Sequence, residues 1–318
     1  MKIGILGAGA YALALADIMV SNKHKVTIWS KFEEEIDYLN KTRKNNNFEN
    51  YIIPGEIIFT NDLNLVMNND LIIFAVPGDF IDNTALEIKE LVDNQHFCIA
   101  SKGMFKDKTL FQVVKEIINT NNIGVISGPT FAVDIIKKVP IGLSISSLNQ
   151  QTTDLIIEAL KNDRVGVDIK NDIIGVSICG SLKNIAAIGS GIITGLNLPI
   201  STQALLMTKL IYEIREVIKY YGGNNDTIIS LAGIGDLILT CTSKKSRNFS
   251  LGLMIGKNED KKKINEYIEN TTIEGIAALN QIKELIINRK INIPIITCIY
   301  NIIYNDQNIN QLIQIITK

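Results

Sequence analysis

The sequence is poor in histidine, and this limits the chemistry that it can support. Among its 318 residues are only two histidines, His24 and His96, and each lies just before a predicted strand, where a solvated turn residue is the simplest interpretation. We therefore expect neither a Ser-His-Asp triad nor a histidine-rich zinc site. The four cysteines form no C-x-x-C pair and no metal-ligand spacing. We expect no metal ion, and we interpret the cysteines mainly as small core residues of a protein kept in a reducing cytoplasm. They are Cys98, Cys179, Cys241 and Cys298.

The sequence also lacks an excess of charge of either sign. Its net charge is −1, with 46% hydrophobic and 20% charged residues, which is typical of a soluble globular protein. There is no basic or acidic footprint for nucleic acid or for an anionic membrane surface. Residues 184–208 are uncharged over a length that could span a membrane, but Gly195, Asn197 and Pro199 divide them into helix, loop and helix. We expect no nucleic-acid partner and no membrane span.

The first thirty residues predict a dinucleotide-binding unit. Residues 2–6 are typical of a buried strand, residues 11–20 of a helix and residues 25–29 of a second strand. The turn between the first strand and the helix carries G-x-G-x-x-A. Gly7 allows the tight turn, Gly9 lets the backbone approach a pyrophosphate, and Ala12 permits close packing of helix and strand. The N–H groups at the start of the helix would bind the phosphates.

The end of the second strand bears on the choice of cofactor. An NAD-specific site expects a carboxylate there to bind the ribose 2′-hydroxyl. This strand instead ends in Trp29-Ser30-Lys31, and Lys31 could face a 2′-phosphate. The pattern favours NADP, or tolerance of both cofactors. The alternative is that Lys31 only solvates its loop.

Strands and helices continue to alternate as far as residue 127. Strands are predicted at 57–59, 71–77, 97–101 and 123–127, and helices at 79–92 and 109–119. This order is typical of a doubly wound parallel sheet, whose ligands bind at the carboxyl ends of the strands. Lys102 follows one such end and is placed for substrate or cofactor, unless it is a solvated loop lysine. From about Ile173 onward the pattern indicates helices without clear strands.

The predicted fold class is therefore α/β, with an N-terminal Rossmann-type domain of doubly wound parallel sheet followed by an all-α C-terminal domain. We place the dinucleotide-binding domain at residues 1–172 and the helical domain, which would carry substrate and catalytic groups, at residues 173–318. The chain length agrees with about two domains.

Two almost uncharged segments of the helical half each contain one ion. Residues 177–192, "SICGSLKNIAAIGSGI", hold Lys183, and residues 227–243, "TIISLAGIGDLILTCTS", hold Asp236. A helix that is apolar all round is buried, and burial disfavours a lone ammonium group. The opposite signs suggest that the two side chains meet. The alternatives are a Lys183 that reaches water from a helix end and an ion pair with a purely structural role.

A possible phosphate site follows the second of these segments. Ser246, Arg247 and Asn248 offer a hydroxyl, a planar guanidinium and an amide just before a predicted helix. Arginine binds phosphate oxygens through two parallel hydrogen bonds, and a helix N-terminus favours anions.

Over nearly its whole length the sequence resembles the bacterial NAD(P)-dependent glycerol-3-phosphate dehydrogenases. The resemblance rests on motifs in a fixed order: "GAGAYALALA", "IIPG", "AVP", "ASKG", "ISGPTFA", "GSLKNIAAIGSGI", "GIGDLILTCTSKKSRN" and "TIEG". It implies that Lys183 is the catalytic lysine, assisted by Asp236 and Lys102. The implied substrate-binding residues are Lys102, Gly128, Thr130, Lys183, Asp236, Ser246, Arg247 and Asn248. The implied cofactor-binding residues are Gly7, Gly9, Ala10, Tyr11, Lys31, Lys102, Ala132, Arg247 and Glu274.

The resemblance implies an oxidoreductase that interconverts dihydroxyacetone phosphate and sn-glycerol 3-phosphate with NADP or NAD, NADPH being favoured. Such an enzyme supplies glycerol 3-phosphate for phospholipid synthesis, and we expect a cytoplasmic homodimer. The alternatives are a ketopantoate reductase or β-hydroxyacid dehydrogenase, whose substrates carry a carboxylate, and a non-catalytic NADPH-binding sensor. A sensor would not need Lys183 and Asp236 together.

The chain departs from the family pattern at several positions. The segment after Gly195 usually carries an asparagine and basic residues ending in Thr-Arg-Gly, whereas this chain has "STQALLMTKL". Ser201, Gln203 and Lys209 stand in for those residues, and Ala10 replaces a more usual serine. We expect these changes to affect substrate affinity or catalytic rate rather than the fold.

Overall fold

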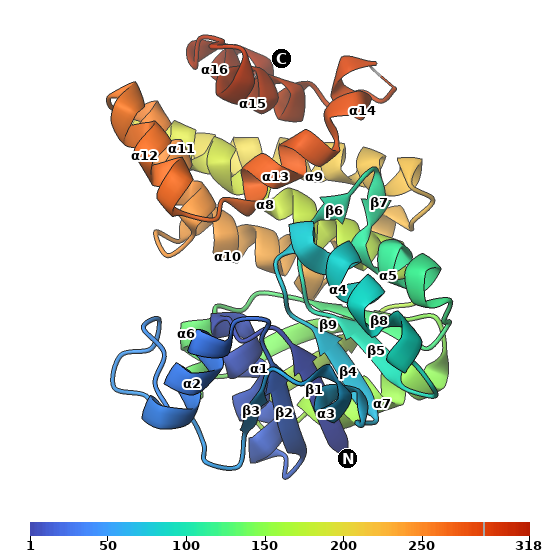
Figure 1. Ribbon diagram of the computed structural model, residues 1–318. Helices are drawn as coiled ribbons and strands as arrows, with labels where there is room; N and C mark the ends of the chain where they lie inside the picture. The colour runs from blue at the N-terminus through green and yellow to red at the C-terminus, as the bar shows by residue number, and fades with distance from the viewer. Residues whose placement is uncertain (289) are drawn as a thin grey trace. The chain divides into compact units, whose positions relative to one another are not determined.

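The computed structural model describes residues 1–288 and 290–318, which form two compact units (Figure 1). The first unit contains residues 1–102 and 108–173, and the second contains residues 103–107 and 174–318. Each unit is described by itself below.

The first unit is built on an eight-stranded sheet in the order β10-β9-β8-β5-β4-β1-β2-β3. All neighbouring strands are parallel except β8 and β9, which are antiparallel. The strands are β1 (Lys2–Leu6), β2 (Lys25–Trp29), β3 (Ile58–Thr60), β4 (Leu71–Phe74), β5 (His96–Ile99), β8 (Ile123–Ser127), β9 (Ile141–Ser147) and β10 (Val165–Ile169). The central strands are almost continuously apolar because both faces of the sheet are covered.

The strand order reverses at β1, which pairs with β2 on one side and β4 on the other. Open α/β sheets bind ligands beyond the carboxyl ends of the strands at such a reversal. The predicted α/β fold class is confirmed.

The helices of the first unit form groups that cover the sheet. Helix α1 packs against α6 and α7, while α4 packs against α5. The helices are α1 (Ala10–Ser21), α2 (Glu33–Thr42), α3 (Leu63–Met67), α4 (Ile81–Ile88), α5 (Leu110–Ile118), α6 (Ala132–Ile136) and α7 (Gln150–Leu160). The single helix predicted at 79–92 is instead α4 flanked by two 3₁₀ turns, Gly78–Phe80 and Lys89–Leu91.

The interpretation of His96 as a solvated turn residue is wrong. His96 is the first residue of β5 and is buried, and its Nδ1 lies 2.8 Å from the hydroxyl of Thr152 on α7. Burial lowers the pKa of the His96 imidazole. A buried polar ring needs a hydrogen-bond partner, and here that partner comes from a helix that the sequence pattern did not predict.

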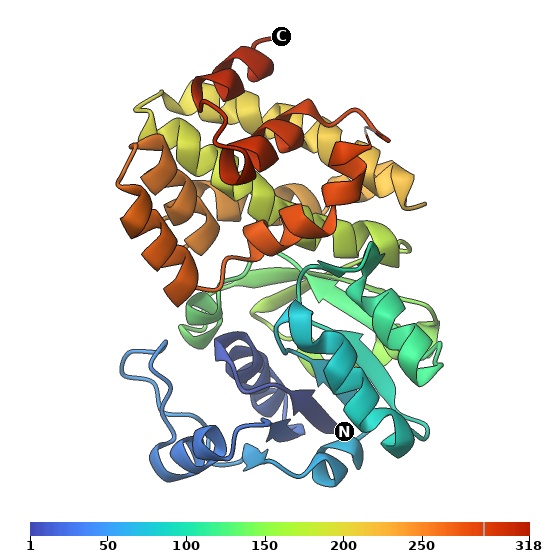
Figure 2. The same cartoon turned by 45° about the horizontal axis from the view of Figure 1, so that its top comes forward.

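Apart from the short strand β6 (Met104–Phe105), the elements described in the second unit are helices. Figure 2 shows the segments from yellow-green to red as helices. They are α8 (Ile173–Gly195), α9 (Ile200–Tyr220), α10 (Asp236–Thr242), α11 (Arg247–Gly256), α12 (Lys261–Asn270), α13 (Glu274–Gln281), α14 (Lys283–Ile287), α15 (Pro294–Tyr304) and α16 (Asn310–Ile316). Short 3₁₀ and π turns, Asn225–Ile228 and Leu231–Gly235, precede α10.

Helix α8 is the central element of this unit. A Cβ placed on Gly191 would lie 2.1 Å from the Phe249 carbonyl oxygen, and one on Gly252 would lie 2.0 Å from the Ile188 oxygen. The glycines therefore let the backbones of α8 and α11 come into direct contact. Among the described residues α8 alone is long and apolar enough to span a membrane, but 89% of its apolar window is buried, as in the core helix of a globular unit.

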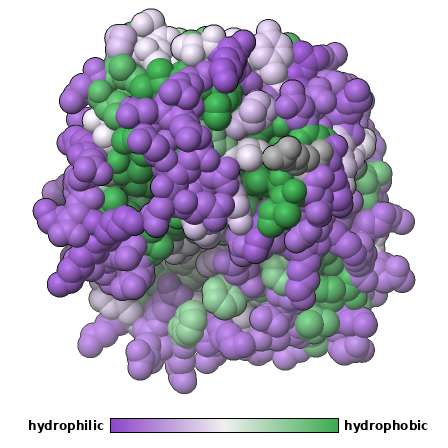
Figure 3. All heavy atoms as spheres, turned by 90° about the horizontal axis from the view of Figure 1, so that it is seen from above, coloured by the Kyte–Doolittle hydropathy of each residue, from purple (hydrophilic) through white to green (hydrophobic). Residues whose placement is uncertain are grey.

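The face seen in Figure 3 is mostly hydrophilic, with scattered apolar side chains.

Candidate active site

The glycine turn of the first unit fits a dinucleotide pyrophosphate. Gly7 has a φ of 110°, and a Cβ there would lie 2.8 Å from the Ala75 carbonyl oxygen, so only glycine suits this position. A Cβ on Gly9 would meet no atom within 4 Å, which leaves open space beside the backbone. Helix α1 begins at Ala10 with no side-chain cap and no acidic residue in its first turn. The uncapped N–H groups of that turn are suited to bind phosphate oxygens.

Two carboxylates lie beside the end of β2. The Ser30 hydroxyl donates to Oε2 of Glu35, from α2, at 2.5 Å. The ammonium group of Lys31 donates to Oε1 of Glu87, from α4, at 2.6 Å. Residues 29–31 contain no carboxylate, but Glu35, from the acidic run that follows them, and the distant Glu87 both lie beside this strand end. Lys31 is thus a paired cation rather than an isolated one.

Lys102 and Tyr11 lie together in the first unit. Nζ of Lys102 is 5.7 Å from the centre of the Tyr11 ring, a cation–π distance. Tyr11 is in the first turn of α1, and Lys102 follows β5. Ser101 lies between β5 and Lys102, and its hydroxyl donates to the Val76 carbonyl oxygen at 2.5 Å. This hydrogen bond ties the loop after β5 to the loop after β4. The structure therefore brings two predicted cofactor-binding residues side by side.

The loop after β8 contains the predicted residues Gly128 and Thr130, and Ala132 begins α6. A Cβ on Gly128 would lie 2.6 Å from the Gly142 carbonyl oxygen, so this glycine is also required for packing against β9. Thr130 is buried, and its hydroxyl has no hydrogen-bond partner among the described residues. A buried hydroxyl without a hydrogen-bond partner in the protein is suited to bind a ligand.

The expected ion pair of the second unit is present. Lys183 on α8 donates from Nζ to Oδ1 of Asp236, the first residue of α10, at 2.5 Å. The two side chains are 7% and 0% exposed, so both charges are desolvated. Thr240 holds the aspartate in place: its hydroxyl lies 2.6 Å from the Asp236 carbonyl oxygen and 3.3 Å from Oδ1. Burial raises the pKa of the neighbouring Cys241 thiol and so favours its neutral form.

The three predicted phosphate-binding residues lie at the start of α11. Ser246 is the N-cap of this helix, and its hydroxyl accepts the Phe249 N–H at 3.2 Å. Arg247 follows and is exposed. Asn248 is buried, and its Oδ1 accepts the Gly275 N–H at 2.8 Å. The structure thus gives Ser246 and Asn248 structural contacts of their own and leaves the Arg247 side chain at the surface.

One polar residue of this region was missed by the sequence analysis. Asn184, next to Lys183, accepts a hydrogen bond from Asn248 Nδ2 at 2.9 Å and donates to Glu274 Oε2 at 2.9 Å. The predicted residues Asn248 and Glu274 are therefore joined through Asn184. The available signal was a second polar side chain directly after Lys183 in a mostly apolar helix, since a buried amide needs partners.

Three of the departures from the family pattern lie in α9, and the fourth, Ala10, begins α1. Gln203 is buried and donates to the Ser190 hydroxyl at 2.6 Å and to the Cys241 carbonyl oxygen at 2.9 Å, so it ties α9 to α8 and α10. Ser201 is exposed. Lys209 lines a cavity of about 820 Å³ that, among the described residues, has neither Lys183 nor Asp236 in its lining.

The fold and the site define a class of protein. A glycine turn and an uncapped helix at the strand-order reversal form a dinucleotide-binding unit, and the same chain carries a helical unit with a desolvated lysine–aspartate pair. This combination belongs to the dinucleotide-dependent oxidoreductases that add a helical unit to a Rossmann-type sheet.

Comparison with known proteins identifies the particular family. The chain belongs to the NAD-dependent glycerol-3-phosphate dehydrogenase family, whose N-terminal model matches residues 2–153 and whose C-terminal model matches residues 172–314. A glycerol-3-phosphate dehydrogenase [NAD(P)+] of Thermoanaerobacter sp. (strain X514) is 33% identical over 97% of this chain and 94% of its own. One from Staphylococcus haemolyticus is 31% identical over 98% and 96%. The family resemblance inferred from the motifs is confirmed.

Solved structures agree with this assignment. The crystal structure of glycerol-3-phosphate dehydrogenase from Coxiella burnetii has a TM-score of 0.93 and 32% identity, covering 100% of this chain and 98% of that chain. A ketopantoate reductase from Ralstonia eutropha matches with a TM-score of 0.60 and 13% identity, covering 100% of both chains, and so shares the fold alone. The alternative of a ketopantoate reductase is therefore not favoured.

Proposed function

We propose that this protein is an enzyme that interconverts dihydroxyacetone phosphate and sn-glycerol 3-phosphate with NADPH or NADH. Its place would be the cytoplasm, where it would supply glycerol 3-phosphate for phospholipid synthesis. The observation that carries the proposal is the buried Lys183–Asp236 pair in a chain of this family. Two desolvated ions in nearly uncharged surroundings are costly, and a catalytic proton donor with its orienting carboxylate accounts for them.

The cofactor would be held mainly by the first unit. Its nicotinamide, when bound, supplies the hydride that reduces the ketone carbon. The Gly7–Gly9 turn and the first-turn N–H groups of α1 would bind the pyrophosphate. The remaining cofactor contacts that we propose are Ala10, Tyr11, Lys31, Lys102, Ala132, Arg247 and Glu274.

Lys183 would be the acid and base of the reaction. In reduction its Nζ gives a proton to the substrate oxygen as hydride adds to the carbon, and in oxidation it takes that proton back. Its positive charge also stabilises the developing alkoxide, and the desolvated surroundings strengthen this effect. Asp236 orients the ammonium group through the 2.5 Å hydrogen bond. Lys102 would add positive potential near the carbonyl.

The phosphate end of the substrate would be bound chiefly by Arg247, through two parallel hydrogen bonds. Ser246 and Asn248 flank it, and their contacts with the backbone fix where α11 begins. The unpartnered hydroxyl of Thr130, with Gly128 beside it, would supply a further hydrogen bond to bound substrate.

The decisive assay is consumption of NADPH with dihydroxyacetone phosphate and, separately, with ketopantoate. We expect turnover with the first substrate only. Lys183→Ala should lower kcat by about 10²–10⁴-fold, the usual contribution of a general acid, and leave NADPH binding nearly unchanged. Lys261→Ala, which removes a lysine from an exposed ion pair with Asp306, is the matched control and should keep full activity. Retention of more than about a tenth of kcat in Lys183→Ala would overturn the assignment.

We further propose that the active protein is a homodimer. A subunit contact on the helical unit would cover exposed apolar side chains: Ile200 is 78% exposed, Ile229 70% and Tyr212 61%. The mass in solution, measured by light scattering, tests this proposal, and a monomeric mass at assay concentration would contradict it.

A further inference from the structure

The ion pair at the end of β2 joins two elements of the first unit. Lys31 follows β2 by two residues, and its partner Glu87 lies near the end of α4. Their N···O distance is 2.6 Å, and the side chains are 66% and 34% exposed. The neighbouring hydroxyl of Ser30 is bonded to Glu35. Lys31, which the sequence analysis considered as a partner for a 2′-phosphate, therefore already has a carboxylate partner.

NADPH and NADH differ only in the phosphate on the adenosine ribose, and residues at the end of the second strand meet that position. Lysine is a point charge on a flexible stem, so it can turn from one anion to another. A partly exposed ion pair is weak, and it therefore competes with a ligand without excluding it. A 2′-phosphate can bind the ammonium group of Lys31 only if that group leaves the carboxylate of Glu87.

We propose that Glu87 is a specificity-determining residue that acts through Lys31. By holding the ammonium group it reduces the advantage of a 2′-phosphorylated cofactor and keeps the two cofactors closer in affinity. The inference rests on the proposed function, because it assumes that a dinucleotide binds at the glycine turn. Glu87 is a positioning residue and not a catalytic one.

The test measures binding without catalysis. Adenosine 2′,5′-bisphosphate and 5′-AMP differ only in the 2′-phosphate, and their dissociation constants are measured by calorimetry, alongside those of NADPH and NADH. Glu87→Gln should tighten adenosine 2′,5′-bisphosphate by about two- to fivefold, the strength of a partly exposed ion pair, and leave 5′-AMP unchanged. Glu116→Gln removes the carboxylate of another exposed lysine pair of this unit, with Lys108, and should change neither constant.

A second variant tests whether Glu87 acts through Lys31. In a Lys31→Ala background, Glu87→Gln should no longer change the ratio of the two dissociation constants, because the ammonium group that it releases is gone. An unchanged ratio in Glu87→Gln alone, or the same gain with and without Lys31, overturns the inference. If wild type binds the nucleotides and Glu87→Gln leaves the ratio of the two dissociation constants unchanged, only the inference on Glu87 fails and the proposed function stands. If wild type binds neither NADPH nor NADH, both proposals fall.

Discussion

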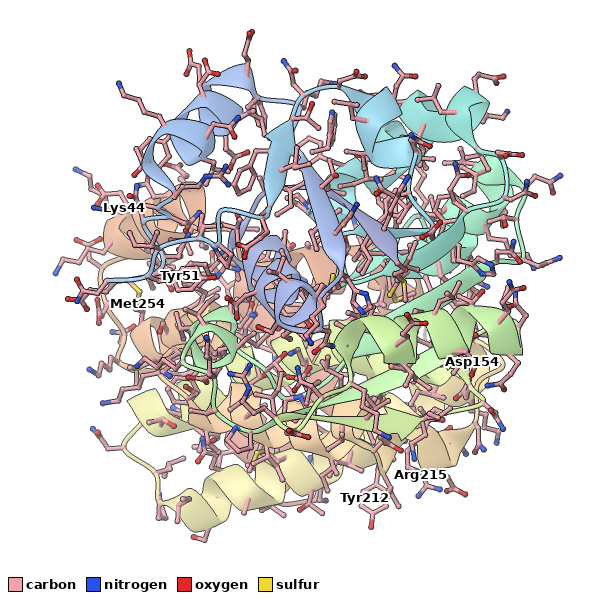
Figure 4. All side chains as sticks on the ribbon, turned by 90° about the horizontal axis from the view of Figure 1, so that it is seen from below. Lys44, Tyr51, Asp154, Tyr212, Arg215 and Met254 are labelled. Atoms are coloured by element: carbon pink, nitrogen blue, oxygen red, sulfur yellow. The ribbon has the colours of Figure 1, made fainter. Side chains whose placement is uncertain are left out.

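Glu213 makes the stability of the helical unit depend on pH. This residue of α9 is 5% exposed, and its carboxylate accepts the N–H groups of Ile295 at 2.7 Å and Ile296 at 2.9 Å, at the start of α15. Its neighbours on α9, Tyr212 and Arg215, are labelled in Figure 4 at the surface of the molecule. Burial raises the pKa of Glu213 from 4.5 to about 7 and outweighs the two hydrogen bonds, which favour the charged form.

The sign and size of the effect follow from linkage. An acid whose pKa is raised on folding binds more protons in the folded state than in the unfolded state. The proton on Glu213 therefore adds to the free energy of unfolding, and this stabilisation is fully present below pH 4.5. This stabilisation decreases as the pH rises from 4.5 through about 7, and above that pH it is absent. A pKa rise from 4.5 to about 7 corresponds to about 3 kcal/mol of unfolding free energy over that interval.

Urea unfolding of wild type and Glu213→Gln between about pH 5 and pH 8 measures this loss. Glutamine keeps one acceptor for the α15 N-terminus but does not titrate. The unfolding free energy of wild type minus that of the variant should fall by about 2–3 kcal/mol across this range, because other titrating groups cancel in the difference. Glu216→Gln, an exposed carboxylate of the same helix, is the control. A difference that stays flat with pH would refute the reasoning.

Three further predictions concern the helical unit. Asp236→Asn leaves Lys183 buried without its carboxylate, so it should cost roughly 3–5 kcal/mol of stability and reduce kcat at least about 100-fold, and an unchanged Tm with near-normal kcat would contradict this. Gly252→Ala places a Cβ 2.0 Å from the Ile188 oxygen, so it should sharply lower Tm, and a wild-type Tm would show that α8 and α11 can separate without cost. Arg247→Ala should lower kcat/KM for dihydroxyacetone phosphate by roughly 1.5–3 kcal/mol, the usual value of hydrogen bonds to a charged group, and equal losses with phosphate-free dihydroxyacetone would show that Arg247 does not bind phosphate.

Strands β1 to β5 and β8 and helices α1, α4 and α5 could be predicted, because each leaves a short-range pattern, whereas helices α2, α3, α6 and α7 were not predicted. An apolar run marks a strand buried on both faces, and the glycines mark the turn before α1. Strands β9 and β10 were not predicted. Their sequences, "IGLSISS" and "VGVDI", interrupt the apolar run with serine, glycine and aspartate. β10 is the edge strand of the sheet and β9 lies next to it, and neither strand is buried along its whole length.

The Lys183–Asp236 pair was predictable for a different reason. Each ion stands alone in an uncharged segment, and the cost of burying a lone charge requires a partner of opposite sign. The sequence indicated this pairing although 53 residues separate the two side chains, but it did not require it. Asp17 also stands alone in an uncharged segment, residues 3–22, and its partner is the Tyr51 hydroxyl at 2.6 Å.

The sequence by itself determined most strands of the first unit, the glycine turn and the family, and it indicated the Lys183–Asp236 pair, since each of these leaves a signal in residue type and near neighbours. The tertiary structure alone decided the partners of Lys31, Asn184 and Glu213. Lys31 is 56 residues from Glu87, and Glu213 is 82 residues from Ile295, in regions that contain many other charges or backbone N–H groups. Hydrogen bonds and ion pairs extend only a few ångströms, so where several partners exist the packing of the elements chooses among them.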